Sequence, residues 1–222
     1  MTRVDRHIAA PRRGRPSAQE ALLVDERVLS AATTLFLELG FGRTTLDMVS
    51  QLARTGKSAL YARYPNKESL FSAVVQHSIQ TMFAHMSSVD SPSDYRSRLR
   101  SAGRQLIEGM LHPRCVALMR ITAAEAHNFP ELALLAYRVS FDGSVRCVVS
   151  ALEGALLPAG QDIKEIAHRF VEVAVQPLSF QAAFGLNPDA LRQRSASSVD
   201  DAIALLCATG RLTVDFHPEV TH

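Results

Sequence analysis

The stretch TTLDMVSQLARTGKSALYARYPNKESLF, residues 44–71, contains signals for two short helices, a tight turn between them and the start of a third helix. Thr44 with Asp47 three residues later has the pattern of a helix N-cap, and Pro65 prevents the second helix from continuing. Asn66 then caps the next helix. This order is typical of a helix-turn-helix, whose second helix contacts the major groove of DNA. The alternative is an ordinary helical corner with solvated polar residues.

Apolar residues at helical spacing flank this stretch on both sides. The preceding helix ends at Gly40, a typical C-terminal stop, and its apolar face consists of Val28, Ala32, Leu35, Phe36 and Leu39. The following helix spans residues 67–86 and ends in a polar segment that marks a domain junction. Further helices, bounded by Pro, Gly or Asn, are predicted over residues 94–111, 113–127, 130–157, 162–186 and 198–210.

The sequence therefore predicts an all-α fold with three parts. Residues 1–16 form a flexible basic arm, residues 17–66 a three-helix DNA-binding domain of the helix-turn-helix type, and residues 67–222 a helical bundle. Alternating β-branched residues are scarce, which disfavours a sheet.

Charge and cysteine content restrict the classes of function. Residues 1–70 hold 11 Lys or Arg against 7 Asp or Glu, although the net charge of the chain is only +2, so the basic end is the expected polyanion-binding face. The three cysteines are widely separated, which disfavours a disulfide framework or a structural zinc site. Residues 170–186, the most apolar stretch, are interrupted by polar residues and proline, so we expect no membrane contact and a cytoplasmic location.

The second helix of the pair has the small and polar side chains that a recognition helix requires at its N-terminal end. Lys57, Ser58 and Ala59 are the candidates for base contacts, and Lys57 suits guanine O6 and N7. Tyr61 falls on an outward face that can reach phosphates. The same residues resemble the end of a nucleotide-binding loop, but that motif needs Gly where this chain has Gln51 within a predicted helix.

Residues 25–75 resemble the DNA-binding domain of the TetR family of transcriptional regulators. The resemblance is carried by Val28-Leu29-x-Ala31-Ala32-x-x-Leu35-Phe36-x-Glu38-x-Gly40-Phe41-x-x-Thr44-Thr45 and by Leu60-Tyr61-x-x-Tyr64-Pro65-Asn66-Lys67-Glu68-x-Leu70-Phe71. It implies that Thr44 and Thr45 hold a phosphate at a helix N-terminus, and that Tyr61 and Lys67 make further backbone contacts.

The turn departs from the pattern of this family. Arg54, Thr55 and Gly56 stand where the family usually has Gly, a small apolar residue and Ser. A left-handed Arg54 would cost about 1 kcal/mol more than Gly. The phosphate contact of the usual Ser is missing, and Thr55 is the candidate to replace it.

The N-terminal arm contains Arg12-Arg13-Gly14-Arg15-Pro16 directly ahead of the DNA-binding domain. Such a slim basic segment can enter an A·T-rich minor groove, so Arg13 and Arg15 are candidate DNA contacts. The alternative is a basic tail that only raises nonspecific affinity.

The resemblance also implies that the helical bundle binds a small effector and forms a homodimer through its last two long helices. Residues 120–132 resemble the C-terminal regions of regulators related to efflux-pump repressors, which suggests a hydrophobic or aromatic effector. Candidate effector contacts are Leu106, Met110, Met119, Phe129, Tyr137, Phe141 and Phe170. Candidate dimer contacts are Ile166, Phe170, Ala174, Leu178, Ala202, Ile203 and Leu206.

These features predict a ligand-responsive repressor of a palindromic operator, without a cofactor or metal and without enzymatic activity. The alternatives are an effector-independent or activating DNA-binding regulator, and a helical metal protein or enzyme. Glu165, His168 and Glu172 share one helix face, but a di-iron site needs a second Glu-x-x-His, and a solvated helix face explains them better.

Overall fold

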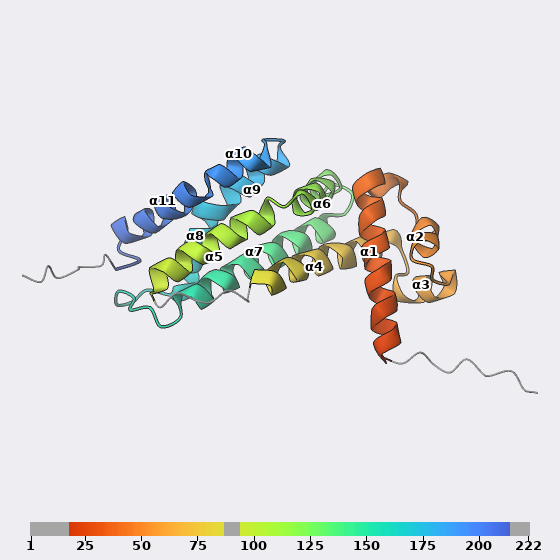
Figure 1. Cartoon of the computed structure of the whole chain (residues 1–222), viewed down its shortest axis with the longest axis horizontal. Coiled ribbons are helices and arrows are strands. Elements are labelled where there is room, and N and C mark those ends of the chain that lie inside the picture. Colours follow the sequence, from red (N-terminus) through yellow and green to blue (C-terminus); the bar gives the residue numbers. More distant parts are fainter. Residues whose placement is uncertain (1–17, 87–93, 214–222) are drawn as a thin grey trace, which may run out of the picture.

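The computed structural model describes residues 18–86 and 94–213, and within these ranges every regular element is a helix (Figure 1). This confirms the predicted all-α fold. The elements are α1 (Ala18–Arg43), α2 (Leu46–Leu52), α3 (Lys57–Arg63), α4 (Lys67–Met86), α5 (Tyr95–Met110), α6 (Pro113–Ala124), α7 (Pro130–Leu152), α8 (Ile163–Phe170), the π-helix η1 (Val171–Val175), α9 (Gln176–Ala183), α10 (Pro188–Gln193) and α11 (Ser195–Ala208). The predicted arm lies outside the described residues.

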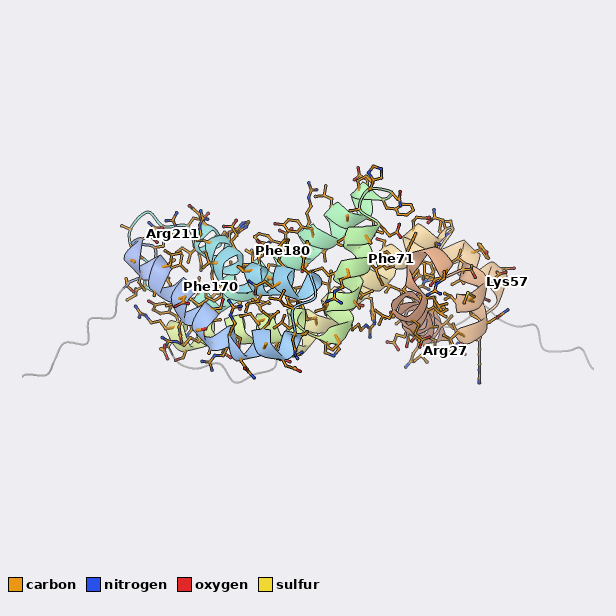
Figure 2. All side chains as sticks on the ribbon, turned by 90° about the horizontal axis from the view of Figure 1, so that it is seen from above. Arg27, Lys57, Phe71, Phe170, Phe180 and Arg211 are labelled. Carbon is orange, nitrogen blue, oxygen red and sulfur yellow. The ribbon has the colours of Figure 1, made fainter. Side chains whose placement is uncertain are left out.

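One hydrophobic core joins α1, α2 and α3 to the first half of α4. The helix α1 is kinked at Gly40, whose φ of 77° is a left-handed value that glycine adopts readily. The kink returns Phe41 toward Phe36 and Phe71, with ring centroids 5.9 and 5.4 Å apart. Phe71 lies where the two parts of the molecule meet (Figure 2). The helix predicted to end at Gly40 is therefore interrupted there, and the helical element continues to Arg43.

A second core fills the helical bundle, and α4 connects it to the first. Leu70 and Val74 of α4 are fully buried in the first core, whereas Phe83 packs against the second. Phe83 lies so close to Gly143 of α7 that a Cβ at Gly143 would overlap the aromatic ring. Figure 1 shows α4 running from α1 along α7, so α4 is a continuous link between the two parts.

Two elements in the C-terminal part were not predicted. Residues 162–186 form α8, η1 and α9 rather than one helix, because Pro177 has no N–H and the preceding Gln176 N–H bonds to Val171 O, five residues back. The short helix α10 begins after Asn187, whose side chain caps it by accepting a hydrogen bond from Asp189 N.

The three cysteines form no disulfide and are partly buried. Burial raises the pKa of Cys115 and of Cys147, so both thiols stay protonated at neutral pH. Within the described ranges, none of the helices combines the length and the apolar character needed to cross a membrane.

Candidate DNA-binding site

The helix α3 projects from the protein with most of its surface uncovered. Of its seven residues only Leu60 is buried, where it packs into the first core. Lys57, Ser58 and Ala59 are exposed on its first turn, and Tyr61 is 45% exposed on the next. Lys57 lies at the outer end of the molecule, away from the helical bundle (Figure 2). The predicted base-contacting residues thus share one exposed helix end, and their contact with bases stays a prediction.

The turn between α2 and α3 contains the left-handed residue that its sequence predicts. Arg54 has a φ of 51°, which costs about 1 kcal/mol relative to Gly. Two hydrogen bonds hold the turn: Ser50 Oγ donates to Thr55 O at 2.8 Å, and Thr55 N donates to Ser50 O at 3.1 Å. Each contributes roughly 0.5–1.5 kcal/mol, which offsets the strain at Arg54.

The N-cap of α2 is Thr45, one residue after the predicted position. Thr45 Oγ1 accepts a hydrogen bond from Met48 N at 3.2 Å, and Thr45 is exposed. Thr44 is buried, and its hydroxyl donates to the carbonyls of Gly40 at 2.8 Å and Leu35 at 3.1 Å. The predicted cap at Thr44 is therefore wrong, because the kink in α1 frees these carbonyls and draws the Thr44 hydroxyl inward. Phosphate contact by either threonine stays a prediction.

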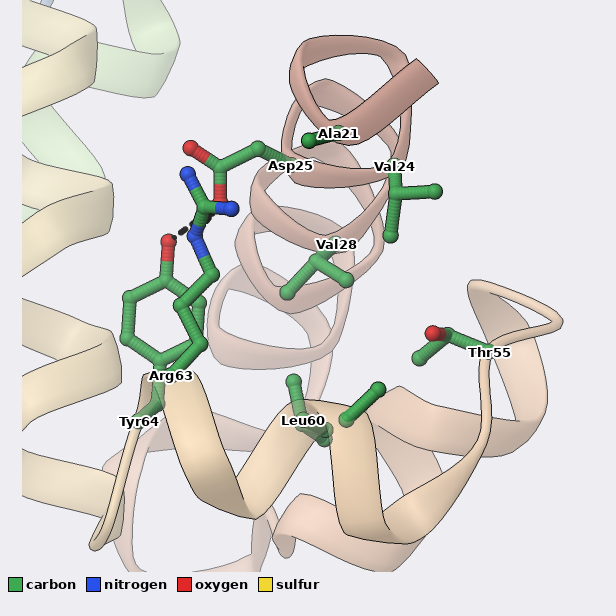
Figure 3. Close-up of a pocket in the computed structure, with 9 residues that line it drawn as sticks. Ala21, Val24, Asp25, Val28, Thr55, Leu60, Arg63 and Tyr64 are labelled. Carbon is green, nitrogen blue, oxygen red and sulfur yellow. Dashed lines mark hydrogen bonds and ion pairs between the residues drawn. The ribbon is translucent and has the colours of Figure 1, made fainter. Parts of the chain in front are cut away.

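A hydrogen-bonded triad fixes the C-terminal end of α3 against α1 (Figure 3). Asp25 Oδ1 accepts a hydrogen bond from the Tyr64 hydroxyl at 2.6 Å and lies 2.7 Å from Arg63 Nε. Burial, and after it the hydrogen bond to Asp25, raises the pKa of Tyr64 to about 12. Asp25 and Tyr64 lie 39 residues apart, so sequence spacing gave no signal for this contact.

A groove of about 240 Å³ lies between α1 and α3 beside this triad. Its lining is mostly apolar and comprises Ala21, Val24, Asp25, Val28, Thr55, Ala59, Leu60, Arg63 and Tyr64. Thr55, the predicted replacement for a phosphate-binding serine, is thus half-buried at the edge of this groove.

The two lysines of the predicted DNA surface have intramolecular partners. Lys57 Nζ donates to Asp47 Oδ2 at 2.6 Å, and the hydrogen bond and charge of Asp47 raise the pKa of Lys57. Lys67 Nζ donates to Gly42 O at 3.1 Å and lies 4.4 Å from the centre of the Phe41 ring. Both ammonium groups stay on the surface. The other predicted cations, Arg13 and Arg15, lie outside the described residues.

Comparison with known proteins agrees with this architecture. Residues 28–74 match the model of bacterial regulatory proteins of the tetR family, and residues 97–209 match the model of the C-terminal domain of AefR-like transcriptional repressors. The chain belongs to the TetR family of transcriptional regulators. The predicted resemblance is confirmed, and this family identifies the chain as a regulator and not an enzyme.

Several known regulators are similar to this TetR-family chain in sequence or in structure. The HTH-type regulator YhgD of Bacillus subtilis is 43% identical over 47 residues, and IcaR, the negative regulator of the biofilm operon icaADBC of Staphylococcus epidermidis, is 36% identical over 52 residues. These matches cover 21% and 23% of this chain, and only 25% and 28% of the two relatives. The solved structure of the flavonoid-responsive regulator FrrA is 26% identical over 87% of this chain and all of its own, with a TM-score of 0.65.

The predicted effector contacts of this TetR-family regulator are distributed over both cores and the surface. Leu106 and Phe170 are fully buried in the second core, with Met110 packed against it. Phe129 instead packs on Phe41 of the first core, with ring centroids 5.1 Å apart. The remaining three, Met119, Tyr137 and Phe141, lie partly or largely at the surface. Effector binding by these residues stays a prediction.

Tyr137 and Phe141 form a small aromatic cluster on α7. Their rings are stacked with centroids 5.6 Å apart, and His168 of α8 approaches Phe141 edge-on at 5.1 Å. Gln176 Nε2 lies 3.3 Å from the Tyr137 hydroxyl. In this cluster the predicted effector residues Tyr137 and Phe141 meet polar groups of α8 and α9.

The predicted dimer contacts are core residues of a single chain, which corrects the predicted interface. Each is at most 3% exposed because α8, η1, α9 and α11 turn these side chains toward α5 and α7; they are Ile166, Phe170, Ala174, Leu178, Ala202, Ile203 and Leu206. The opposite faces carry Phe180 and Phe184, which are 63% and 75% exposed, and Leu205, which is 44% exposed. A surface for a second copy must therefore involve different residues.

The three side chains considered as metal ligands make other contacts. Glu165 pairs with Arg211 at 3.2 Å, Glu172 pairs with Arg169 at 3.0 Å, and His168 packs against the Phe141 ring. In the part of the chain that the structure describes, no three His, Cys, Asp or Glu residues are close enough to share a metal ion.

Proposed function

We propose that this TetR-family regulator is a ligand-responsive repressor whose α3 enters the major groove of a palindromic operator. The observation that carries the proposal is the exposure of α3, a seven-residue helix that buries only Leu60 yet is fixed at its C-terminal end by Asp25 and Tyr64. A helix so short gains little stability of its own. Because it is held at its C-terminal end, its uncovered first turn is suited to contact a partner. IcaR, which is similar to this chain over 52 residues, is a negative transcriptional regulator.

Repressors of a palindromic operator bind as two-fold dimers, and the exposed aromatic rings of α9 support such an assembly. Phe180 of α9 and Phe184, which follows the last residue of α9, have ring centroids 4.6 Å apart. Both rings are largely exposed, so they form an apolar surface that a second copy would remove from water. Phe180→Glu with Phe184→Glu should give a monomer in light scattering, whereas Leu156→Glu, at an exposed loop residue, should leave the dimer intact.

The effector of the proposed repressor is a small hydrophobic or aromatic molecule that binds the helical bundle. Two observations support this choice: the stacked Tyr137 and Phe141 rings beside polar groups, and the similarity to FrrA, a regulator that is flavonoid-responsive by name. Because α4 packs in both cores, an effector that displaces it would move α3. A coupling of roughly 1–3 kcal/mol would weaken operator binding about 5- to 150-fold.

Gel retardation with the DNA upstream of the chain's own gene tests the proposal. At moderate salt the protein should retard this DNA in the presence of excess shuffled duplex, and Lys57→Ala should relax the preference at one base pair per half-site by about 1–3 kcal/mol. Equal affinity for the upstream and shuffled DNA would contradict the proposal. Failure to bind DNA together with stoichiometric metal in the purified protein would favour the metal-protein alternative.

A panel of apolar and aromatic compounds then tests the effector. Release of the upstream DNA by one of them, at a concentration that leaves the fold intact, is the expected result. DNA binding that no compound changes would favour an effector-independent regulator, and tighter binding would favour an activating one.

A further inference from the structure

One exposed ion pair joins the two helices of the helix-turn-helix. Lys57, the first residue of α3, places Nζ 2.6 Å from Oδ2 of Asp47 in the first turn of α2. The two side chains are 58% and 47% exposed. The carboxylate and the ammonium group therefore both lie on the surface that the proposed function turns toward DNA.

Stability gives a weak reason for this pair. An exposed ion pair contributes little to stability, because water and salt screen the two charges. A carboxylate in the first turn already favours α2 through the helix dipole, wherever its side chain points. If α3 contacts DNA as proposed, the negative charge of Asp47 beside the exposed cap residue Thr45 would repel the phosphates and lower nonspecific affinity. We therefore expect the contact between Asp47 and Lys57 to act in DNA recognition rather than in stability.

The chemistry of the lysine side chain indicates what that consequence is. A free ammonium group on a flexible four-carbon chain can pair with any nearby phosphate, which adds affinity but no sequence preference. The hydrogen bond to Asp47 occupies one of the three donors of Lys57 and holds Nζ near the start of both helices. Two donors remain, which is the number that guanine O6 and N7 can accept.

We propose that Asp47 is a positioning residue for sequence specificity: it holds Lys57 for a guanine edge and keeps it from the phosphates. This inference rests on the proposed function, because it requires that α3 contacts DNA. Asp47 itself need not touch a base.

A thermodynamic cycle of Asp47→Asn, Lys57→Met and the double variant tests the inference. Each protein is titrated with a site that the unmodified protein selects from random duplex DNA, with the same site altered at the preferred guanine, and with unrelated DNA, over a range of salt concentrations. Asp47→Asn should tighten binding to unrelated DNA, steepen the salt dependence by about one phosphate contact, and reduce the preference for the guanine about five-fold or more. In the Lys57→Met background, Asp47→Asn should change neither the preference nor the salt slope.

Asp200→Asn is the matched control, because Asp200 pairs with Arg100 at 2.7 Å and is similarly exposed, but lies on α11 in the helical bundle. It should leave the guanine preference and salt slope unchanged. An effect of Asp47→Asn that is equal with and without Lys57 would overturn the inference, since Asp47 would then act only by its charge. If the unmodified protein selects no sequence, the proposed function fails instead.

Discussion

The contact between Asp25 and Tyr64 should be a main source of the stability of α3, and Asp25→Ala tests this. Tyr64 is only 7% exposed. In Asp25→Ala its hydroxyl would therefore lose its hydrogen-bond partner without becoming fully hydrated. A hydrogen bond to a charged acceptor contributes about 1.5–3 kcal/mol, and the ion pair with half-exposed Arg63 adds roughly 0.2–1 kcal/mol. We therefore expect Asp25→Ala to lower the free energy of unfolding by about 2–3 kcal/mol.

For a chain of this length, such a loss corresponds to a decrease in Tm of roughly 4–12 °C. Circular dichroism melting gives the stability, and amide exchange of α3 shows whether the loss begins there. Tyr64→Phe should cost less than Asp25→Ala, because it leaves the pair of Asp25 with Arg63 in place. In the double variant, the coupling between the two positions should be about 1–2 kcal/mol.

Asp200→Ala is the control for this cycle, since it breaks an exposed ion pair away from α3 and should change stability by less than about 1 kcal/mol. Additive effects of Asp25→Ala and Tyr64→Phe, with α3 amides protected as before, would refute the claim that this hydrogen bond holds the helix.

Three further predictions concern the contact between α4 and α7, the buried residue Leu60 of α3 and the titration of Tyr64. Gly143→Ala should lower the free energy of unfolding by about 1–3 kcal/mol, because the new Cβ overlaps the Phe83 ring. Gly109→Ala should lower it less, because its Cβ meets only the flexible Met82 side chain, and chemical denaturation measures both. Leu60→Ala should lower the free energy of unfolding by about 2–5 kcal/mol and abolish operator retardation, while circular dichroism still reports a folded bundle. Unaltered retardation would contradict the assigned role of α3. Because the pKa of Tyr64 is raised from 10.0 to about 12, the stability from its neutral form is complete below pH 10 and is lost as the pH rises through 12. Tyr64→Phe should therefore remove an ionisation near pH 12 from an ultraviolet absorbance titration.

Local chemical signals in the sequence were sufficient to predict most helix boundaries. The predicted range 67–86 coincides with α4, because Asn66 caps it through a 2.7 Å hydrogen bond from Ser69 N. Asp94 caps α5 in the same way, by accepting from Ser97 N at 2.8 Å. Such caps are formed by residues within one turn of each other, so spacing alone identifies them.

Features that depend on contacts between distant residues could not be predicted in this way. The apolar periodicity of α8 and α11 shows which face is buried but not what covers it. The same pattern therefore fits a dimer interface and a core, and the structure places residues such as Ile166 in the core. Thr44 and Thr45 have the same capping chemistry, and the kink in α1 determines which of them turns inward. The ion pair of Lys57 with Asp47 depends on the angle between α2 and α3, which the turn sequence does not specify.

Methylation interference at guanine N7 tests most directly the central claim that α3 occupies the major groove, because N7 lies in that groove. DNA upstream of the gene is partly methylated, bound by the protein and separated into free and bound fractions. We predict interference at a guanine in each of two half-sites whose centres are roughly 10 base pairs apart, and loss of this interference in Lys57→Ala. Binding that no guanine methylation disturbs, or interference that persists unchanged in Lys57→Ala, would contradict the account of how α3 contacts DNA.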